Sequence, residues 1–246
     1  MEDLELNQKQ ILIIDDEPDL LEIISSEFEL EGANVFQADS VEKAISVLSN
    51  NPIDIVISDV RMPFRTGIDL LKYMKDKNAF YPPMILISGY TDVPIQDIYD
   101  LGAEGFLVKP FRLEDLILLT SRLLKNNGPN WPLFDSNNMT EFIFEINNNL
   151  KDAVQNNVFA LGRGGCAFYL SNSLHKTQID REINFSIQLM DKILKGSGAI
   201  RWVEHGINSN RTQIGIEFRT LDSESQKFFK DYLVHNKTIP YIPHFK

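Results

Sequence analysis

The sequence predicts a doubly wound α/β fold for the first half of the chain and a small antiparallel β-barrel with a C-terminal helix for the second. In the first half, short apolar runs alternate five times with segments of helical periodicity. Three of these runs consist almost entirely of Ile, Val and Leu, as strands buried on both faces require. In the second half, short β-like runs separated by Asn, Gly, Ser and charged residues replace the alternation.

The first half contains five strand and helix pairs. The first pair is an apolar strand at 11–14 and a helix at 19–31 that ends at Gly32. The other four pairs are 34–38 with 41–48, 53–57 with 68–75, 84–87 with 93–101, and 106–108 with 113–124. Strands that alternate with helices predict a parallel sheet covered on both faces. Ligands bind such sheets outside the carboxyl ends of the strands.

Polar residues follow the predicted strands at this edge of the sheet. Asp15 and Asp16 follow the first strand, Asp59 the third, Ser88 the fourth and Lys109 the fifth. Carboxylates that converge repel one another, and a hard divalent cation such as Mg²⁺ relieves the repulsion. We expect Asp16 and Asp59 to be side-chain ligands, with Asp15 close by or acting through water. The alternatives are a helix cap for the aspartate pair and an ordinary turn at Lys109.

Four motifs carry a family resemblance over residues 9–125. ILIIDDEP, ISDVRMPFRTG, LISGYTD and FLVKPF resemble the motifs of response-regulator receiver domains, in the same order and at similar separations. The resemblance implies that Asp59 accepts a phosphoryl group and that Lys109 and Ser88 contact its oxygens. It also implies that the backbone carbonyl of Arg61 joins the aspartates around Mg²⁺.

The resemblance also suggests how the phosphorylated state is sensed. Phe106 matches an aromatic residue that turns inward when the hydroxyl at Ser88 moves toward the phosphoryl group, and core packing is its alternative role. Arg61 and Tyr90 occupy positions that influence the lifetime of the phosphoryl group in the family. A sensor histidine kinase or a small phosphodonor would load Asp59, so the chain would be a phosphoacceptor rather than an enzyme.

The second half begins after a turn-rich linker at 126–139. Residues 139–150 are compatible with either a helix or a strand. The expected strands are 158–161, 166–170, 183–189, 199–203 and 212–218. A helix at 222–234 is expected to plug or cover the barrel, and a short tail occupies 236–246.

Residues 140–235 resemble a PilZ domain through ALGRGGCAFYL, INFSIQL, GSGAIRWVEHG and TQIGIEFRTLD. PilZ domains commonly bind cyclic di-GMP through an RxxxR arginine pair and a [DN]xSxxG motif. Here no arginine occurs between Lys125 and Arg163, and Ala160 and Gly162 replace the acid or amide and the serine, whereas Gly165 is present. Lys151 offers charge without the planar fork of an arginine. We therefore do not expect cyclic di-GMP binding in the usual mode.

The remaining candidates in the second half have structural interpretations. Arg163 is a candidate contact for an anion or cyclic di-GMP, and an exposed loop charge is the alternative. Cys166 is expected to be a small buried side chain and Trp202 a core residue. The histidines lack metal-ligand spacing and are expected at the surface, with His205 in a hairpin turn. They are His175, His205, His235 and His244.

Composition excludes several classes of function. Residues 1–125 hold 23 acidic against 11 basic side chains and residues 126–246 hold 12 against 13, so neither half offers a basic stripe for DNA. No segment approaches the length of about 20 apolar residues that a membrane span needs. A single cysteine cannot form an internal disulfide. We expect a cytoplasmic protein.

Three hypotheses for function remain. The first is a response regulator that relays phosphorylation of Asp59 through the PilZ-like domain to an unidentified protein, or through phosphorylation-dependent homodimerisation. The second is a dual-input receptor that also binds cyclic di-GMP by another surface, against which the missing arginines count. The third is a transcription regulator, against which the absence of a helix-turn-helix signal counts.

Overall fold

The computed structural model divides into two compact units. The first comprises Met1–Pro94 and Leu101–Asn127, and the second comprises Ile95–Asp100 and Gly128–Lys246. The residues that the structure describes are 6–80, 82–89, 93–125, 133–134, 141–170, 179–205, 212–236 and 238–245. Most of the predicted linker lies outside them.

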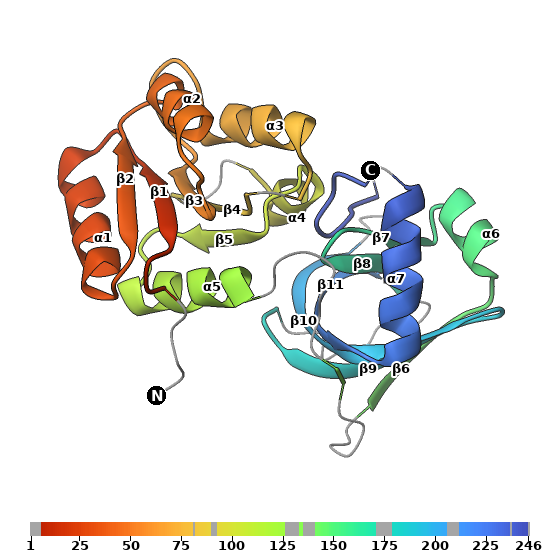
Figure 1. The fold of residues 1–246 in the computed structure, drawn as a ribbon. Helices are drawn as coiled ribbons and strands as arrows, with labels where there is room; N and C mark the ends of the chain where they lie inside the picture. The colour runs from red at the N-terminus through yellow and green to blue at the C-terminus, as the bar shows by residue number, and fades with distance from the viewer. Residues whose placement is uncertain are drawn as a thin grey trace. The chain divides into compact units, whose positions relative to one another are not determined.

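The first unit is built on a five-stranded parallel sheet in the order β2-β1-β3-β4-β5. Its strands are β1 (Gln10–Ile14), β2 (Asn34–Ala38), β3 (Ile55–Asp59), β4 (Met84–Ser88) and β5 (Gly105–Val108). Its helices are α1 (Pro18–Leu30), α2 (Val41–Asn50), α3 (Gly67–Lys77) and α5 (Leu113–Lys125). Figure 1 shows α1 and α5 on one face of the sheet and α2 and α3 on the other. The predicted doubly wound parallel sheet is confirmed, with the strand order of flavodoxin-like folds.

The core of the first unit explains why the helices cover both faces. The strands β3 and β4 are buried along their whole length, as the apolar runs that precede their polar ends predict. On one face, alternate strand residues pack with the apolar sides of α1 and α5, including Ile24, Phe28 and Leu116. Burying a side chain of this size contributes about 1.5–3 kcal/mol relative to leaving it in water. The carboxyl ends of the strands are thereby fixed on a rigid layer.

A buried ion pair supports the start of β4. Lys75 Nζ lies 2.7 Å from Glu104 Oε1, and the other oxygen of Glu104 accepts a hydrogen bond from the backbone N–H of Met84 at 2.8 Å. Both side chains are almost fully buried. Because a buried charge is costly unless it is paired and hydrogen-bonded, these contacts fix the register of β4 beside β5.

The second unit is built on a six-stranded sheet in the order β6-β9-β10-β11-β8-β7. Its strands are β6 (Glu141–Ile146), β7 (Phe159–Leu161), β8 (Gly165–Leu170), β9 (Glu182–Leu189), β10 (Ile193–His205) and β11 (Thr212–Leu221). Its helices are α4 (Ile95–Asp100), α6 (Leu150–Gln155) and α7 (Ser223–His235). The undecided segment at 139–150 therefore contains a strand and the first residue of a helix.

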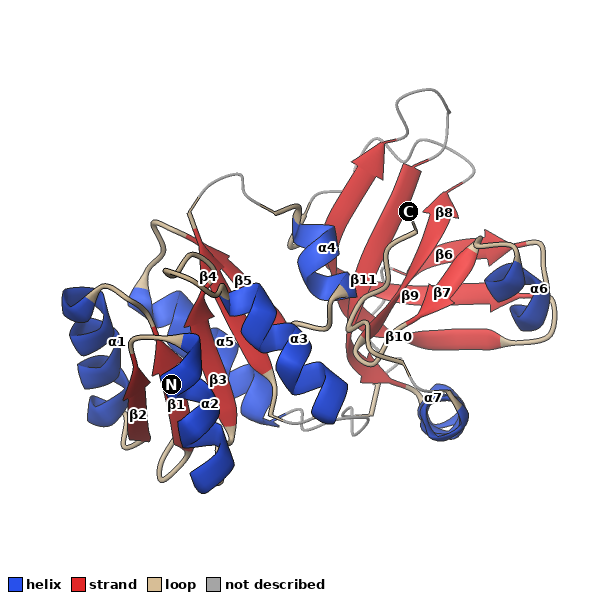
Figure 2. Ribbon diagram, turned by 90° about the horizontal axis from the view of Figure 1, so that it is seen from above, coloured by secondary structure: helices blue, strands red, loops and turns tan. Residues whose placement is uncertain are grey.

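The expected small antiparallel barrel is corrected to a curled mixed sheet. β6 pairs in parallel with β9, whereas the other neighbours are antiparallel. In the described residues β6 and β7 are the two ends of the strand order, so the sheet forms a half-barrel (Figure 2). A parallel pairing between distant segments leaves no local signal in a sequence, because no tight turn joins the two strands.

Helix α7 packs on this sheet, as the sequence indicates for the C-terminal helix. It is capped by Asp222, whose carboxylate accepts a hydrogen bond from the backbone N–H of Ser225 at 2.8 Å. Its buried residues Phe229 and Leu233 join the apolar cluster formed by the strands, and Phe229 packs edge-on against Phe218 at 4.8 Å between ring centroids. The apolar side of α7 thus completes the core of the second unit.

Among the described residues, we find no helix with both the length and the apolar character needed to cross a membrane.

Candidate functional site

The predicted polar edge forms at the carboxyl ends of four adjacent strands. Asp15 directly follows β1, Asp59 ends β3, Ser88 ends β4 and Lys109 directly follows β5. Backbone hydrogen bonds extend the strand pairing to these positions, from Asp15 N–H to the Ala38 carbonyl at 3.2 Å and from Lys109 N–H to the Ser88 carbonyl at 2.7 Å. The functional side chains are therefore held by the sheet and not by free loops.

Lys109 joins the two buried aspartates. Its Nζ lies 2.6 Å from Asp59 Oδ1 and 3.2 Å from Asp15 Oδ2, and 3.8 Å from the exposed Glu17. Asp59 is 5% exposed and Asp15 is 2% exposed, whereas the Lys109 side chain retains 24% exposure. The ammonium group is thus reachable from solvent, and the carboxylates lie beneath it.

Burial and charge perturb both partners. Burial raises the pKa of Asp59 above the usual value of an aspartate, and the charge of Asp15 adds to this effect, against the opposing influence of Lys109. Burial alone would lower the pKa of Lys109, but the hydrogen bond and charge of Asp59, together with Asp15, raise it. Two buried carboxylates share one ammonium group, so a further cation would be electrostatically favoured here.

The other predicted metal ligands lie at the margin of this pair. Asp16 is exposed, and Arg61 donates its backbone N–H to Asp59 Oδ2. Within the described part of the chain, no three His, Cys, Asp or Glu side chains are grouped closely enough to hold a metal ion. The donor chemistry nevertheless suits Mg²⁺, because the buried groups are carboxylate oxygens in excess of the positive charge that faces them.

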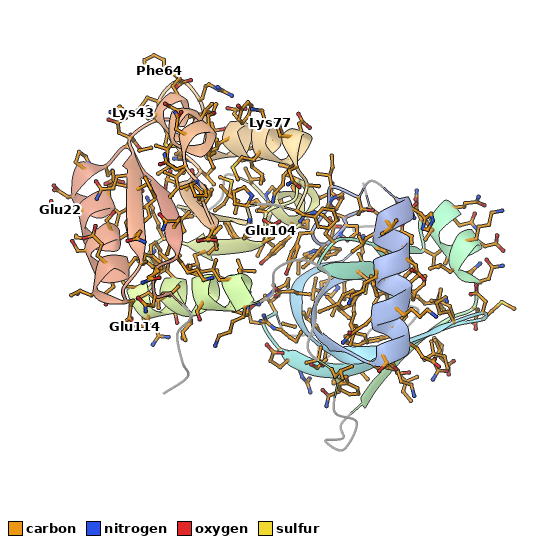
Figure 3. The ribbon with its side chains drawn as sticks, viewed as in Figure 1. Glu22, Lys43, Phe64, Lys77, Glu104 and Glu114 are labelled. Atoms are coloured by element: carbon orange, nitrogen blue, oxygen red, sulfur yellow. The ribbon has the colours of Figure 1, made fainter. Side chains whose placement is uncertain are left out.

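The loop after β3 has three features that the sequence motifs did not assign. A Cβ atom at Gly67 would lie 2.2 Å from the carbonyl oxygen of Asp59, so only glycine lets α3 begin this close to the site. Thr66 and Asp69 form a reciprocal capping box that fixes the same helix start. Phe64 has φ +67° and is fully exposed at the loop tip (Figure 3). The Thr-Gly pair before an apolar helix was the available signal.

The predicted switch residues occupy neighbouring strands. Ser88 is buried and donates its hydroxyl to the Gly89 carbonyl at 3.0 Å. Phe106 lies opposite Leu86 in the β4–β5 pairing and is half-buried. Tyr90 lies outside the described residues.

In the second unit, the interpretation of Arg163 as an exposed charge is wrong. Arg163 is 5% exposed, and its Nε donates to the carbonyl of Ile239 at 2.9 Å. The surface assignment of His244 is also wrong, because its side chain is 9% exposed and lies 2.8 Å from Glu204 and 3.3 Å from Asp97. Each residue is covered by segments distant in the sequence, which local patterns do not reveal.

The remaining assignments in the second unit have mixed outcomes. Cys166 and Trp202 are buried, as expected. His235 is exposed at the end of α7, as expected. His205 is the last residue of β10, where its Nδ1 lies 3.0 Å from Thr212 Oγ1. The following residues and His175 lie outside the described ranges.

Comparisons with known proteins agree on the first half of the chain. Residues 11–120 match the family model of the response regulator receiver domain. Response regulator SaeR of Staphylococcus aureus (strain USA300) is 37% identical over 114 residues, which are 46% of this chain and 50% of the relative. The chain thus spans about half the length of the curated relatives it matches.

Solved structures cover the same half. The Francisella response regulator 1452 receiver domain is 27% identical, with TM-score 0.46, over 48% of this chain and 98% of that one. A receiver domain protein from Clostridium thermocellum is 30% identical, with TM-score 0.45, over 48% and 95%. The segment matched by the family model contains Asp15, Asp59, Ser88 and Lys109. Residues 11–120 of this chain are a response regulator receiver domain.

Proposed function

We propose that the chain is a two-component signalling protein that takes a phosphoryl group on Asp59 and relays the change to its second unit. The observation that carries this proposal is the Asp59 carboxylate, which is buried at the carboxyl edge of the sheet with Lys109 Nζ at 2.6 Å and Asp15 beside the same ammonium. A sensor histidine kinase or a small phosphodonor would supply the phosphoryl group.

The chemistry is a single transfer between two anions. A carboxylate oxygen of Asp59 forms a bond to phosphorus, the bond from phosphorus to the donor breaks, and the donor leaves with its electron pair and takes up a proton. Lys109 would move from Asp59 to an oxygen of the arriving phosphoryl group and offset its negative charge. Ser88 would donate a hydrogen bond to another of these oxygens.

Mg²⁺ is the cofactor that this donor set would hold. Asp15, Asp16 and Asp59 would bind it with the backbone carbonyl of Arg61. When bound, the ion supplies the positive charge that lets an anionic donor approach a carboxylate. The excess of buried carboxylates over ammonium groups at this edge supports the assignment.

The output is proposed to be a protein contact or a change in dimerisation made by the PilZ-like second half. The buried position of Arg163 supports this ranking over a cyclic di-GMP receptor, because its Nε already donates to a backbone carbonyl. The strongly acidic first half supports it over a transcription regulator, since net negative charge repels a phosphate backbone.

The test of this function uses beryllofluoride, which mimics the acyl phosphate. With Mg²⁺ present, we expect beryllofluoride to raise the melting temperature of the wild-type chain and to leave Asp59→Ala unchanged, because the bonding oxygen is absent. The matched control is Asp76→Asn, which alters an exposed carboxylate on α3. An equal thermal shift in wild type and Asp59→Ala would contradict the proposal.

A further inference from the structure

The C-terminal segment, residues 238–245, is bound to the loop before β8. Three consecutive carbonyls accept hydrogen bonds from two loop residues: Ile239 from Arg163 Nε at 2.9 Å, Pro240 from Arg163 N–H at 2.8 Å, and Tyr241 from Gly164 N–H at 3.0 Å. Hydrogen bonds to three successive residues define both the position and the register of the segment. The segment is therefore an ordered part of the second unit.

The loop is shaped to receive this segment closely. A Cβ atom at Gly162 would lie 2.4 Å from the carbonyl oxygen of Tyr241, and one at Gly164 would lie 1.8 Å from the Tyr241 ring. Neither distance is compatible with a side chain, so both glycines are required for the approach. The Tyr241 hydroxyl also donates to the buried carboxylate of Glu217 at 3.1 Å. Gly162, which replaces the serine of the ligand-binding motif, thus has a structural role, and so does Gly164.

The same segment contacts helix α4, which belongs to the second unit. Tyr241 donates its N–H to the carbonyl of Tyr99 at 2.9 Å, and His244 donates its N–H to Asp100 Oδ1 at 3.0 Å. Ile242 is fully buried in an apolar cluster that includes Tyr99 and Trp202. Tyr241 therefore connects α4 to the loop before β8, since its N–H is bound to the Tyr99 carbonyl and its own carbonyl to the Gly164 N–H.

Helix α4 depends on such contacts for its order. It has only 6 residues, and a helix of this length is not stable by itself in water, because nucleation costs more than so few hydrogen bonds return. His244 adds side-chain contacts to Asp97 on α4 and to Glu204 on β10 at 3.3 and 2.8 Å. Residues at the C-terminal end of the chain thus help to order α4 in this unit, together with Ala167 and Trp202 of the same apolar cluster.

We infer that residues 238–245 form a clasp that binds α4 to β10 and to the loop before β8 within the second unit, and that this makes α4 the element through which the receiver reaches its output. The second part of the inference rests on the proposed function, since it requires phosphorylation of Asp59. α4 begins seven residues after Ser88, so a movement of Ser88 toward a phosphoryl group would act on the start of this helix. The clasp then holds or releases α4, and the surface around Trp202 changes with it.

The first arm of the test asks whether the clasp exists, without any phosphorylation. In the full chain, Ile242→Asp should increase amide hydrogen exchange in residues 95–101 by about tenfold or more, because a charge cannot remain in the cluster with Tyr99. Ile239→Asp is the matched control, since the Ile239 side chain is 40% exposed and only its backbone carbonyl is used. Unchanged exchange in both variants would overturn the clasp.

A milder variant covers the case in which Ile242→Asp disturbs the sheet. If exchange also increases at residues 183–189 and 212–221, the second variant, His244→Ala, decides the test, because it removes the side-chain contacts to Asp97 and Glu204 and the edge-on contact with Trp202 but leaves Ile242 in place. Faster exchange at 95–101 in His244→Ala, with the strands still protected, supports the clasp. Wild-type exchange at 95–101 in that variant overturns it.

The second arm asks whether the clasp carries the signal. Mg²⁺ and beryllofluoride should change exchange at both 95–101 and 239–245 in the wild type, and in Ile242→Asp or His244→Ala the response at 239–245 should be lost while a thermal shift still reports occupancy of Asp59. An unchanged 239–245 segment in the wild type, with Asp59 occupied, overturns the coupling. Absence of any thermal shift would overturn the proposed function and leave the first arm to decide the clasp alone.

Discussion

Each unit contains a buried cluster in which three charged side chains meet, and these two clusters differ in charge balance. In the receiver, Asp15 and Asp59 share the single ammonium of Lys109. In the second unit, the single carboxylate of Glu217 faces two guanidinium groups, from Arg201 at 2.7 Å and Arg219 at 3.6 Å. The first cluster has more acid than its partners offset, and the second has its acid fully engaged.

The difference separates a binding site from a structural contact. Burial raises the pKa of Asp59, which means that the ionised carboxylate is less stable at this site than in water. A cation bound beside it would therefore stabilise it. For Arg201, burial alone would lower the pKa of the guanidinium, but Glu217 and its neighbours raise it. A buried charge that its neighbours do not fully neutralise indicates a binding or reactive site. A buried charge that is fully paired indicates a structural role.

The largest change in stability is expected when the buried counter-charge of Arg201 and Arg219 is removed. Glu217→Gln should lower the free energy of unfolding of the second unit by about 3–5 kcal/mol, because two guanidinium groups lose their buried counter-charge. The control is Glu182→Gln, whose carboxylate also pairs with Arg219 but is 62% exposed, and it should cost about 0–1 kcal/mol. Urea denaturation followed by circular dichroism measures both. Equal losses would mean that Glu217 is not the structural centre described here.

Removing the charge of Asp59 in the receiver cluster is expected to raise the free energy of unfolding, the opposite of the effect at Glu217. Because the pKa of Asp59 is raised in the folded chain, the folded state binds this proton more tightly than the unfolded one. Stability is therefore lost as the pH rises from the ordinary carboxyl range through the raised value, and the full cost is present at neutral pH. Asp59→Asn should stabilise the Mg²⁺-free chain at pH 7 by about 0.5–2 kcal/mol.

Two measurements sharpen this prediction. The gain from Asp59→Asn should shrink as the pH falls toward the ordinary pKa of an aspartate, and added Mg²⁺ should stabilise the wild type more than the variant. Asp76→Asn, on an exposed carboxylate of α3, should change little at either pH. A variant that is less stable than the wild type at pH 7 without Mg²⁺ would show that Lys109 outweighs burial at Asp59.

The receiver was predictable from the sequence because its signals are local and mutually consistent. The apolar runs gave the five strands within two residues, and Asp15, Asp59, Ser88 and Lys109 could be assigned to one edge because parallel strands share a direction. Local signals did not predict that the side chains of Asp16 and Phe64 are exposed. Their exposure depends on how the loops close over the edge.

The second unit was harder to predict because long-range contacts decide its features. β10 begins at Ile193, whereas the sequence predicted a strand that begins at 199. The prediction missed the first residues because Gly196 and Gly198 interrupt the apolar strand pattern. The structure needs both glycines, since Cβ atoms there would lie 2.1 and 2.3 Å from carbonyl oxygens of β11 beside a register shift. Arg163 and His244 are buried by partners that lie between 40 and 147 residues away in the sequence.

The smallest effect is expected when cyclic di-GMP is added, because the charged groups of the second unit are already paired. A guanine dinucleotide with two phosphates needs exposed guanidinium groups that can stack and fork. In the second unit, Arg163 donates to the Ile239 carbonyl and Arg201 and Arg219 engage acidic partners, so each is already committed. Calorimetric titration of cyclic di-GMP into the full chain should therefore give no saturable heat at micromolar concentrations. A saturable isotherm that Arg163→Ala abolishes would show that the C-terminal segment yields to the nucleotide, and the second unit would then be a ligand receptor whose compensated charges are exchanged on binding.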